Sequence, residues 1–285
     1  MTSCPVCHLD LPKVHFRKGN FTILKCHHCG FMMASLPPAG SPSPYSSSYF
    51  RSWGMEQGDS PSVQKMKRKT AGHLLRNVER YTVKGRLLDV GCAAGHFLEE
   101  AAFRHWDVYG VEISPYAATL ARKKFGDKIL VGSFLDVPLS SSFFQAVIMS
   151  DVIEHFPDPQ PVLDKAWTIL QPQGVLAIVT PNTESLSALV MGRAWPHFHK
   201  EHLSYFNPQS MDIALKNHGF RLISTKASPK WINLNYAQAQ FRVYRHPFIT
   251  PTINLLTRLI PNPFKEMDIP LILGDLRAIA RKEDG

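Results

Sequence analysis

The chain has 285 residues, of which 44% are hydrophobic and 19% charged, and its formal net charge is +9. This length supports one large core with a small appendage, and the composition is ordinary for a soluble globular protein. No apolar run reaches the roughly 20 residues of a membrane-spanning helix. The N-terminus lacks the pattern of a secretory signal, so we expect a cytoplasmic protein.

Two C-x-x-C pairs lie at the start of the chain, Cys4-Pro5-Val6-Cys7 and Cys26-His27-His28-Cys29. Their spacing fits a zinc ribbon, in which two tight turns each supply two thiolates to one tetrahedral ion. A redox role is less suited, because no βαβ pattern surrounds either pair. The sequence therefore predicts structural Zn²⁺ in a module over residues 1–35. The expected ligands are Cys4, Cys7, Cys26 and Cys29.

A linker rich in Pro and Ser is expected over residues 36–62. Much of the positive charge lies just beyond its start, since Arg51–Arg86 holds nine Lys or Arg residues and three acidic ones. This stretch is either the solvated face of a helix or a stripe that binds phosphates. It lacks the interleaved aromatic residues of a surface that binds single-stranded nucleic acid.

Residues 63–285 alternate between apolar runs of strand length and amphipathic helical stretches. Capping residues, prolines and glycines predict helices over 60–80, 114–126, 159–170 and 207–219. Such alternation implies a Rossmann-like, mostly parallel seven-stranded sheet with helices on both faces. Its expected strands are 86–90, 107–113, 128–131, 145–150, 175–180, 220–225 and 276–280.

The first of these strands runs into a turn of small residues and then a helix, in Leu88-Asp89-Val90-Gly91-Cys92-Ala93-Ala94-Gly95. Small residues let a ligand approach the backbone closely. Glu112 ends the second strand, where a carboxylate can accept hydrogen bonds from both ribose hydroxyls. Asp136 follows the third strand, where it could accept a hydrogen bond from an adenine amino group. The pattern predicts a nucleoside site at the carboxyl ends of these strands.

With these landmarks, Asp151-Val152-Ile153-Glu154-His155-Phe156 and Leu170-Gln171-Pro172-Gln173-Gly174, the chain resembles a class I S-adenosylmethionine-dependent methyltransferase. The resemblance implies that Asp89 and Gly91 line the methionine moiety, Glu112 the ribose and Asp136 the adenine. It also implies that the segment from Ser150 to His155 borders the methyl donor. The full expected cofactor set is Asp89, Gly91, Cys92, Ala93, Gly95, Glu112, Ile113, Phe134, Leu135, Asp136, Ser150 and Asp151. The N-terminal cysteine pairs resemble a zinc-binding extension of some sugar and natural-product methyltransferases.

Four residues are candidates for chemistry at the acceptor. In the resembling enzymes a Glu-His-Leu segment approaches the acceptor, which points to Glu201, His202 and Tyr205. His155 follows the fourth strand at the ligand-facing edge, and a histidine pKa near neutrality suits a general base. The alternative for His155 is a histidine that packs beside the cofactor.

An insertion is expected over residues 228–274, between the last two strands. Its segment 247–264 is apolar and rich in proline but too short to span a bilayer. It could be a lid over the acceptor, a dimer surface, a peripheral membrane contact or simply part of the core. The oligomeric state stays open.

The leading hypothesis is a methyltransferase for a small acceptor, such as a sugar, a lipid-linked molecule or a natural product. One rival is an RNA methyltransferase that holds phosphates with the zinc ribbon and the basic stretch. Others are a nicotinamide-dependent oxidoreductase that uses the same turn and a binding module without catalysis.

Overall fold

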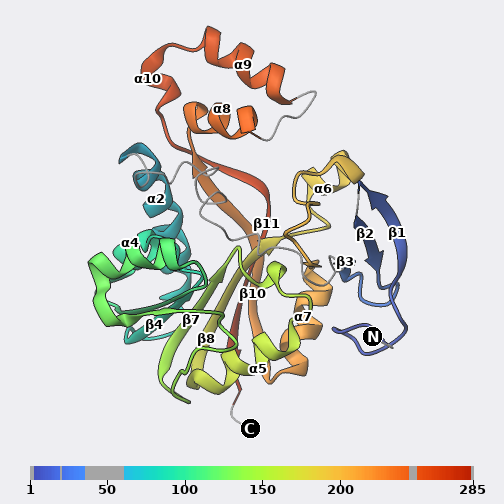
Figure 1. Cartoon of the computed structure of the whole chain (residues 1–285), viewed down its shortest axis with the longest axis vertical. Helices are drawn as coiled ribbons and strands as arrows, with labels where there is room; N and C mark the ends of the chain where they lie inside the picture. Colours follow the sequence, from blue (N-terminus) through green and yellow to red (C-terminus); the bar gives the residue numbers. More distant parts are fainter. Residues whose placement is uncertain (1–2, 20, 36–60, 244–248, 284–285) are drawn as a thin grey trace.

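A computed structural model describes residues 3–19, 21–35, 61–243 and 249–283. Its main element is a seven-stranded sheet in the order β10-β11-β8-β7-β4-β5-β6 (Figure 1). Six of these strands run in the same direction, and β11 runs antiparallel to them between β10 and β8. The predicted Rossmann-like fold is therefore confirmed. The strands are β4 (Arg86–Val90), β5 (Asp107–Glu112), β6 (Ile129–Val131), β7 (Phe144–Ser150), β8 (Leu170–Pro181), β10 (Phe220–Ile232) and β11 (Ile269–Lys282).

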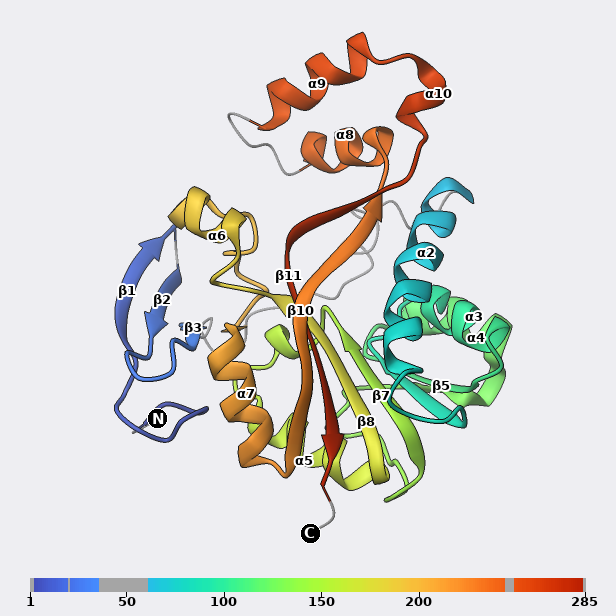
Figure 2. The same ribbon diagram turned by 180° about the vertical axis from the view of Figure 1, so that it is seen from behind.

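Helices cover both faces of the sheet because its central strands are apolar on both sides (Figure 2). In β7, for example, Val147 and Met149 face one helical layer, whereas Ala146 and Ile148 face the other. The first layer holds α5 (Gln160–Ile169) and α7 (Pro208–Asn217). The second holds α2 (Pro61–Val78), α3 (His96–Phe103) and α4 (Pro115–Phe125).

Local sequence signals set the helix starts. The Ser114 side chain accepts a hydrogen bond from the backbone of Ala117 at the start of α4, with a proline in the first turn. Asn207 and Ser210 form a capping box at the start of α7. Short 3₁₀ turns connect other elements: η1 (Gly126–Lys128), η2 (Ile153–His155) and η3 (Gly192–Ala194).

Strands β10 and β11 form a hairpin that is much longer than the sequence predicted. Their pairing continues past a register shift at Ser228/Pro229 and ends at Ile232↔Ile269. Part of the expected insertion 228–274 therefore belongs to the sheet. The rest carries α8 (Leu234–Val243), α9 (Ile249–Leu259) and α10 (Asn262–Lys265), which lie beyond the end of the sheet (Figure 1). No helix among the described residues is long and apolar enough to cross a membrane.

The N-terminal segment forms a second sheet that the rest of the chain completes. Strands β1 (Lys13–Lys18), β2 (Phe21–Lys25) and β3 (Met32–Ala34) are followed in this sheet by β9 (Ser204–Tyr205). Phe31 and Phe206 stack edge to face, with ring centroids 5.2 Å apart. The described residues of this segment, 3–19 and 21–35, thus share a sheet and a core with the large domain. The expected linker lies outside the described residues, except for its last two positions, which begin α2.

Candidate functional site

The turn between β4 and α3 depends on two glycines with positive φ. Gly91 has φ 73°, and a Cβ there would lie 2.7 Å from a methyl carbon of Val152. Gly95 has φ 82° and caps α3. The amide of Gly91 donates to the carbonyl of Val111 at 2.8 Å, which ties the turn to the end of β5. Backbone amides and small side chains therefore line the carboxyl end of β4.

Glu112 links the end of β5 to this turn. One of its carboxylate oxygens accepts from the amide of Ala93 and the other from the amide of Ser114, both at 2.8 Å. Burial raises the pKa of Glu112, although these backbone hydrogen bonds oppose the rise. The pKa of Asp89 is raised by burial and by the neighbouring Glu112. The structure thus brings Asp89 and Glu112, two of the four acidic residues in the expected cofactor set, to the same turn.

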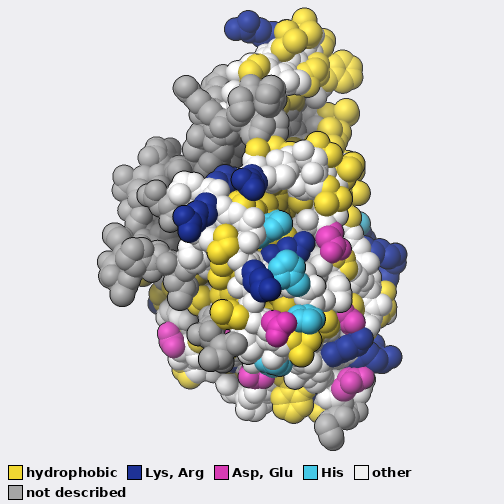
Figure 3. Space-filling model, turned by 90° about the vertical axis from the view of Figure 1, so that its right-hand side faces the viewer, with side chains coloured by type: hydrophobic (Ala, Val, Ile, Leu, Met, Phe, Trp, Pro, Cys, Tyr) yellow, Lys and Arg dark blue, Asp and Glu magenta, His cyan; other side chains and the backbone are white. Residues whose placement is uncertain are grey.

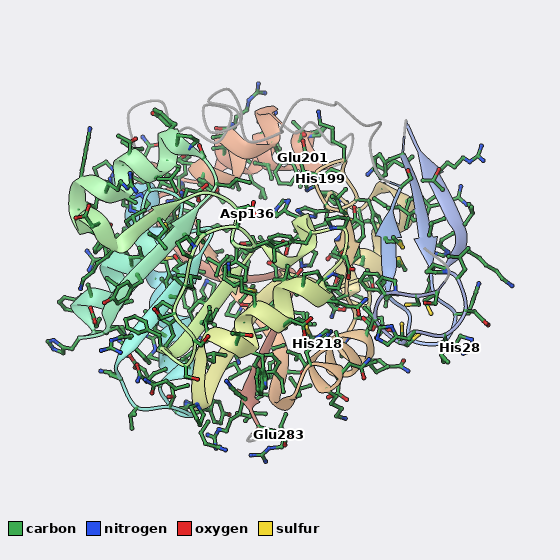
Figure 4. The ribbon with its side chains drawn as sticks, turned by 60° about the horizontal axis from the view of Figure 1, so that its bottom comes forward. His28, Asp136, His199, Glu201, His218 and Glu283 are labelled. Atoms are coloured by element: carbon green, nitrogen blue, oxygen red, sulfur yellow. The ribbon has the colours of Figure 1, made fainter. Side chains whose placement is uncertain are left out.

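The other expected cofactor residues divide into exposed and buried groups. Ile113, Leu135 and Asp136 are exposed, whereas Phe134 is buried. Figure 4 shows Asp136 toward the same end of the molecule as His199 and Glu201, with His218 and Glu283 at the opposite end.

The side chain of Cys92, another expected cofactor residue, points into the core. It packs in the core, where a Cβ added to Gly110 would lie 2.7 Å from its sulfur. Only the backbone of Cys92 can therefore contribute to the turn.

Beside the turn, the end of β7 carries an ion-pair network. Asp151 has φ 56°, and its amide donates to the carbonyl of Val179 at 2.9 Å. Lys230 on β10 lies 2.9 Å from the carboxylate of Asp151 and 3.1 Å from that of Asp275 on β11. Desolvation opposes the charged form of Lys230, but these two carboxylates outweigh it and raise its pKa. The network fixes the start of the 151–155 segment, and Ser150 stands directly before it.

Glu154 and His155 belong to η2, which ends the 151–155 segment. Glu154 is fully buried, and its Oε2 accepts from the hydroxyl of Thr180 at 2.9 Å. Burial and the nearby Asp151 raise the pKa of Glu154 to about 8. His155 Nδ1 donates to the carbonyl of Glu201 at 2.9 Å. Through this bond the 195–205 loop is held against η2.

His202 is the buried histidine of that loop. Its ring centroid lies 4.9 Å from that of His155 and 3.8 Å from that of His199. Burial, with the neighbouring histidines, lowers the pKa of His202 well below its usual value. Burial also lowers the pKa of His155. Both rings are therefore neutral at neutral pH, and each has one nitrogen with a lone pair.

Glu201 and Tyr205, also expected at the acceptor, both contact His199. The carboxylate of Glu201 lies 2.7 Å from His199 Nδ1, a hydrogen bond that lowers the pKa of Glu201. The hydroxyl of Tyr205 donates to the His199 carbonyl at 3.3 Å, and burial raises its pKa. The structure therefore brings the four predicted residues together, with Tyr205 and His202 buried and His155 partly buried.

Three charged residues of this site were not among the individual residues that the sequence predicted for it. Glu154 stands directly before His155, and its place after a buried strand was a usable signal. Lys230 and Asp275 reach the site only because β10 and β11 run on past their predicted ends.

The four N-terminal cysteines lie in the two turns that precede β1 and β3, and these turns pack against α7. The sulfurs of Cys4 and Cys29 are 3.7 Å apart, and those of Cys7 and Cys26 are 3.6 Å apart. Four thiols at such distances, two from each tight turn, match the donors and geometry of a tetrahedral zinc site. None of the five cysteines is in a disulfide within the described residues.

Comparison with known proteins gives consistent matches. A family model described as a methyltransferase domain matches residues 63–225, more than half of the chain. The ubiquinone biosynthesis O-methyltransferase of Cereibacter sphaeroides is 28% identical over 117 residues, which are 39% of this chain and 47% of the relative. The enzyme of that name from Histophilus somni is 27% identical over 142 residues, 46% of this chain and 59% of the relative. The chain spans about half the length of these curated relatives.

A solved structure of a SAM-dependent methyltransferase from Archaeoglobus fulgidus has the same fold, with a TM-score of 0.54 and 20% identity. The match covers 82% of this chain and 99% of the other. The strand order, the turn after β4 and the family match agree, and they argue against the nicotinamide-dependent alternative. The chain therefore belongs to the methyltransferase domain family and has the fold of a SAM-dependent methyltransferase.

Proposed function

We propose that S-adenosylmethionine lies across the carboxyl ends of β4, β5 and β6. Asp89 and the Gly91 turn hold its methionine part, and Glu112 accepts hydrogen bonds from the ribose hydroxyls. Ile113 flanks the adenine, and Asp136 accepts from its amino group. The proposal is supported by the hydrogen bond from the amide of Ala93 in the turn to the carboxylate of Glu112, and by the exposure of Ile113 and Asp136.

The methyl group passes to a small acceptor between η2 and the 195–205 loop. The acceptor's nucleophile forms a bond to the methyl carbon while the sulfur–carbon bond breaks, sulfur keeps that electron pair, and the acceptor's proton passes to a water molecule. The observation that carries this proposal is the close pair of histidines, the partly buried His155 and the buried His202, whose ring centroids are 4.9 Å apart beside the buried Glu154. Glu201 and Tyr205 act as positioning residues through His199. An oxygen nucleophile is supported by the relatives, which are named O-methyltransferases.

Calorimetry with S-adenosylmethionine, and with NAD as the control ligand, tests the cofactor. Methyl transfer to a panel of phenols, sugars and lipid-linked sugars then identifies the acceptor class. We expect His202→Ala to abolish turnover and leave the cofactor affinity unchanged. Tight binding of NAD, or full turnover by His202→Ala, would contradict the proposal.

We further propose that Cys4, Cys7, Cys26 and Cys29 hold a structural Zn²⁺ ion. The four thiols fill its coordination sphere, so the ion takes no part in the reaction. It stabilises the two turns that support β3, and β3 pairs with β9 at the end of the loop that carries His202. The site thereby connects the N-terminal segment to the acceptor side.

A peripheral membrane contact is supported by exposed apolar side chains around the helical segment beyond the sheet. Figure 3 shows hydrophobic side chains gathered toward the upper part of one face. A lipid-linked acceptor would approach from such a surface. The exposed residues there include Leu255 and Leu259 of α9, Phe264 of α10, and Ile272 of β11. Helix α6 (Leu186–Met191), which contacts β11, also exposes Leu186, Leu189 and Val190.

An RNA acceptor has less support. The basic residues of α2 line a cavity of about 490 Å³, which Glu100 and Trp231 also line. Arg68 pairs there with Glu100, and Lys69 pairs with Asp268. These cations are therefore partly neutralised within the chain.

A further inference from the structure

We propose that Glu154, His155 and His202 form a second metal site, which binds a divalent transition-metal ion at the acceptor side of the proposed active site. Each residue offers one ligand atom, and these atoms all lie within 4.8 Å of one another. The role given to the ion rests on the proposed function, because that function places the acceptor here. Binding of the ion itself does not.

Both histidines have the supporting contacts that metal-binding histidines usually have. The other ring nitrogen of such a residue commonly donates to a backbone carbonyl, which fixes the tautomer. His155 Nδ1 donates to the carbonyl of Glu201, so its lone pair is on Nε2. The ring of His202 has a backbone hydrogen bond to His197, and its buried Nδ1 has no partner among the described residues. Each ring therefore has a donor nitrogen suited to an ion.

The carboxylate of Glu154 completes the same arrangement. Its Oε2 is held by the Thr180 hydroxyl, while its buried Oε1 has no hydrogen-bond partner in the described part of the chain. The ammonium of Lys230 pairs directly with Asp151 and Asp275, and its charge acts on Glu154 only as a minor influence that lowers the pKa of that carboxyl group. Leaving a buried carboxylate oxygen and a buried ring nitrogen unpaired is costly. One cation between them would satisfy both.

The donor set indicates the kind of ion. Two imidazoles and one carboxylate suit Zn²⁺, Mn²⁺ or Fe²⁺, whereas Mg²⁺ prefers oxygen ligands and retained water. Three protein ligands also leave coordination places open, in contrast to the four-thiol site. The ion would orient a hydroxyl-bearing acceptor and lower the pKa of its hydroxyl group. This favours phenols and vicinal diols among the acceptors.

Zinc content tests the site in the full chain. After saturation with Zn²⁺ and gel filtration, we expect two ions per chain for the unaltered protein and one for Glu154→Gln and for His202→Ala. The matched control is His197→Ala, which removes a neighbouring histidine outside the three-residue group and should retain two ions. Circular dichroism and cofactor affinity establish that each variant is folded.

Mn²⁺ titration followed by electron paramagnetic resonance identifies the ligand type, because Mn²⁺ prefers oxygen and nitrogen donors to thiolates. The unaltered chain should bind one Mn²⁺ ion, and both ligand variants should bind it at least ~10-fold more weakly. One zinc ion in the unaltered protein, or equal Mn²⁺ affinity in Glu154→Gln, would overturn the metal site. If the unaltered chain did not bind the cofactor, this would instead overturn the proposed function and leave the metal result standing.

Discussion

Replacing Lys18 by Met tests whether the N-terminal segment holds the acceptor loop in place. Lys18 ends β1, and its ammonium donates to the carbonyl of Phe198 at 2.8 Å and to that of Trp195 at 3.3 Å. Both acceptors belong to the loop that leads to His202. Phe16 of the same strand also packs on Phe198, with ring centroids 5.0 Å apart. Methionine keeps most of the apolar stem and removes only the charge and its hydrogen bonds.

The expected effect follows from the shorter of the two bonds. A hydrogen bond to a charged group contributes about 1.5–3 kcal/mol, and the half-buried position of Lys18 argues for the lower value. A loss of about 1.4 kcal/mol corresponds to a tenfold change in an equilibrium. Opening of the 195–205 loop should therefore become roughly ten times more frequent. The cofactor affinity should not change, because the Gly91 turn makes no contact with Lys18.

Hydrogen exchange of the loop amides measures this opening without any knowledge of the acceptor. Lys13→Met is the matched control, since Lys13 begins the same strand and is exposed. We expect faster exchange in Lys18→Met only. Equal protection in both variants, or a loss of cofactor affinity in Lys18→Met, would refute the idea that this lysine holds the loop.

Four further outcomes are expected. Glu112→Ala should weaken S-adenosylmethionine binding roughly 10- to 100-fold in calorimetry, since charged hydrogen bonds to the ribose are lost; unchanged affinity would remove the ribose assignment. Cys26→Ser should release the ribbon zinc and expose residues 3–35 to proteases, and a metal content equal to that of the unaltered chain would exclude this ligand. Gly91→Ala should lower the free energy of unfolding by roughly 2–4 kcal/mol in thermal melts, because φ is positive and Val152 is in the way; an unchanged melting temperature would contradict this. Leu259→Asp should reduce flotation with vesicles, and full flotation would argue against a lipid contact through α9.

The cofactor side was largely predictable because its signals are local. The small residues from Gly91 to Gly95 lie within a few positions of one another, and a strand, a turn and a helix can each be identified from such a window. The position of Glu112 follows from the end of its strand, and parallel strands bring their carboxyl ends to one edge. The roles of these residues toward the cofactor remain predictions.

The acceptor side was predicted only in part because it is built from distant segments. His155 and His202 are 47 positions apart in the sequence, and no local pattern shows that their rings come within 4.9 Å. Lys230 was assigned to the insertion, and Asp275 lies just before the predicted last strand, since a hairpin interrupted by proline and glycine does not have the alternation of a regular strand.

The sequence by itself determined the elements of this protein: the period of its apolar residues, its caps and turns, and the two cysteine pairs. These depend on neighbours a few residues away. Tertiary structure alone decided that β9 completes the N-terminal sheet and that Glu154 faces two histidines in a buried group. Such contacts depend on which surfaces pack together, and packing is a property of the whole chain that no short window contains.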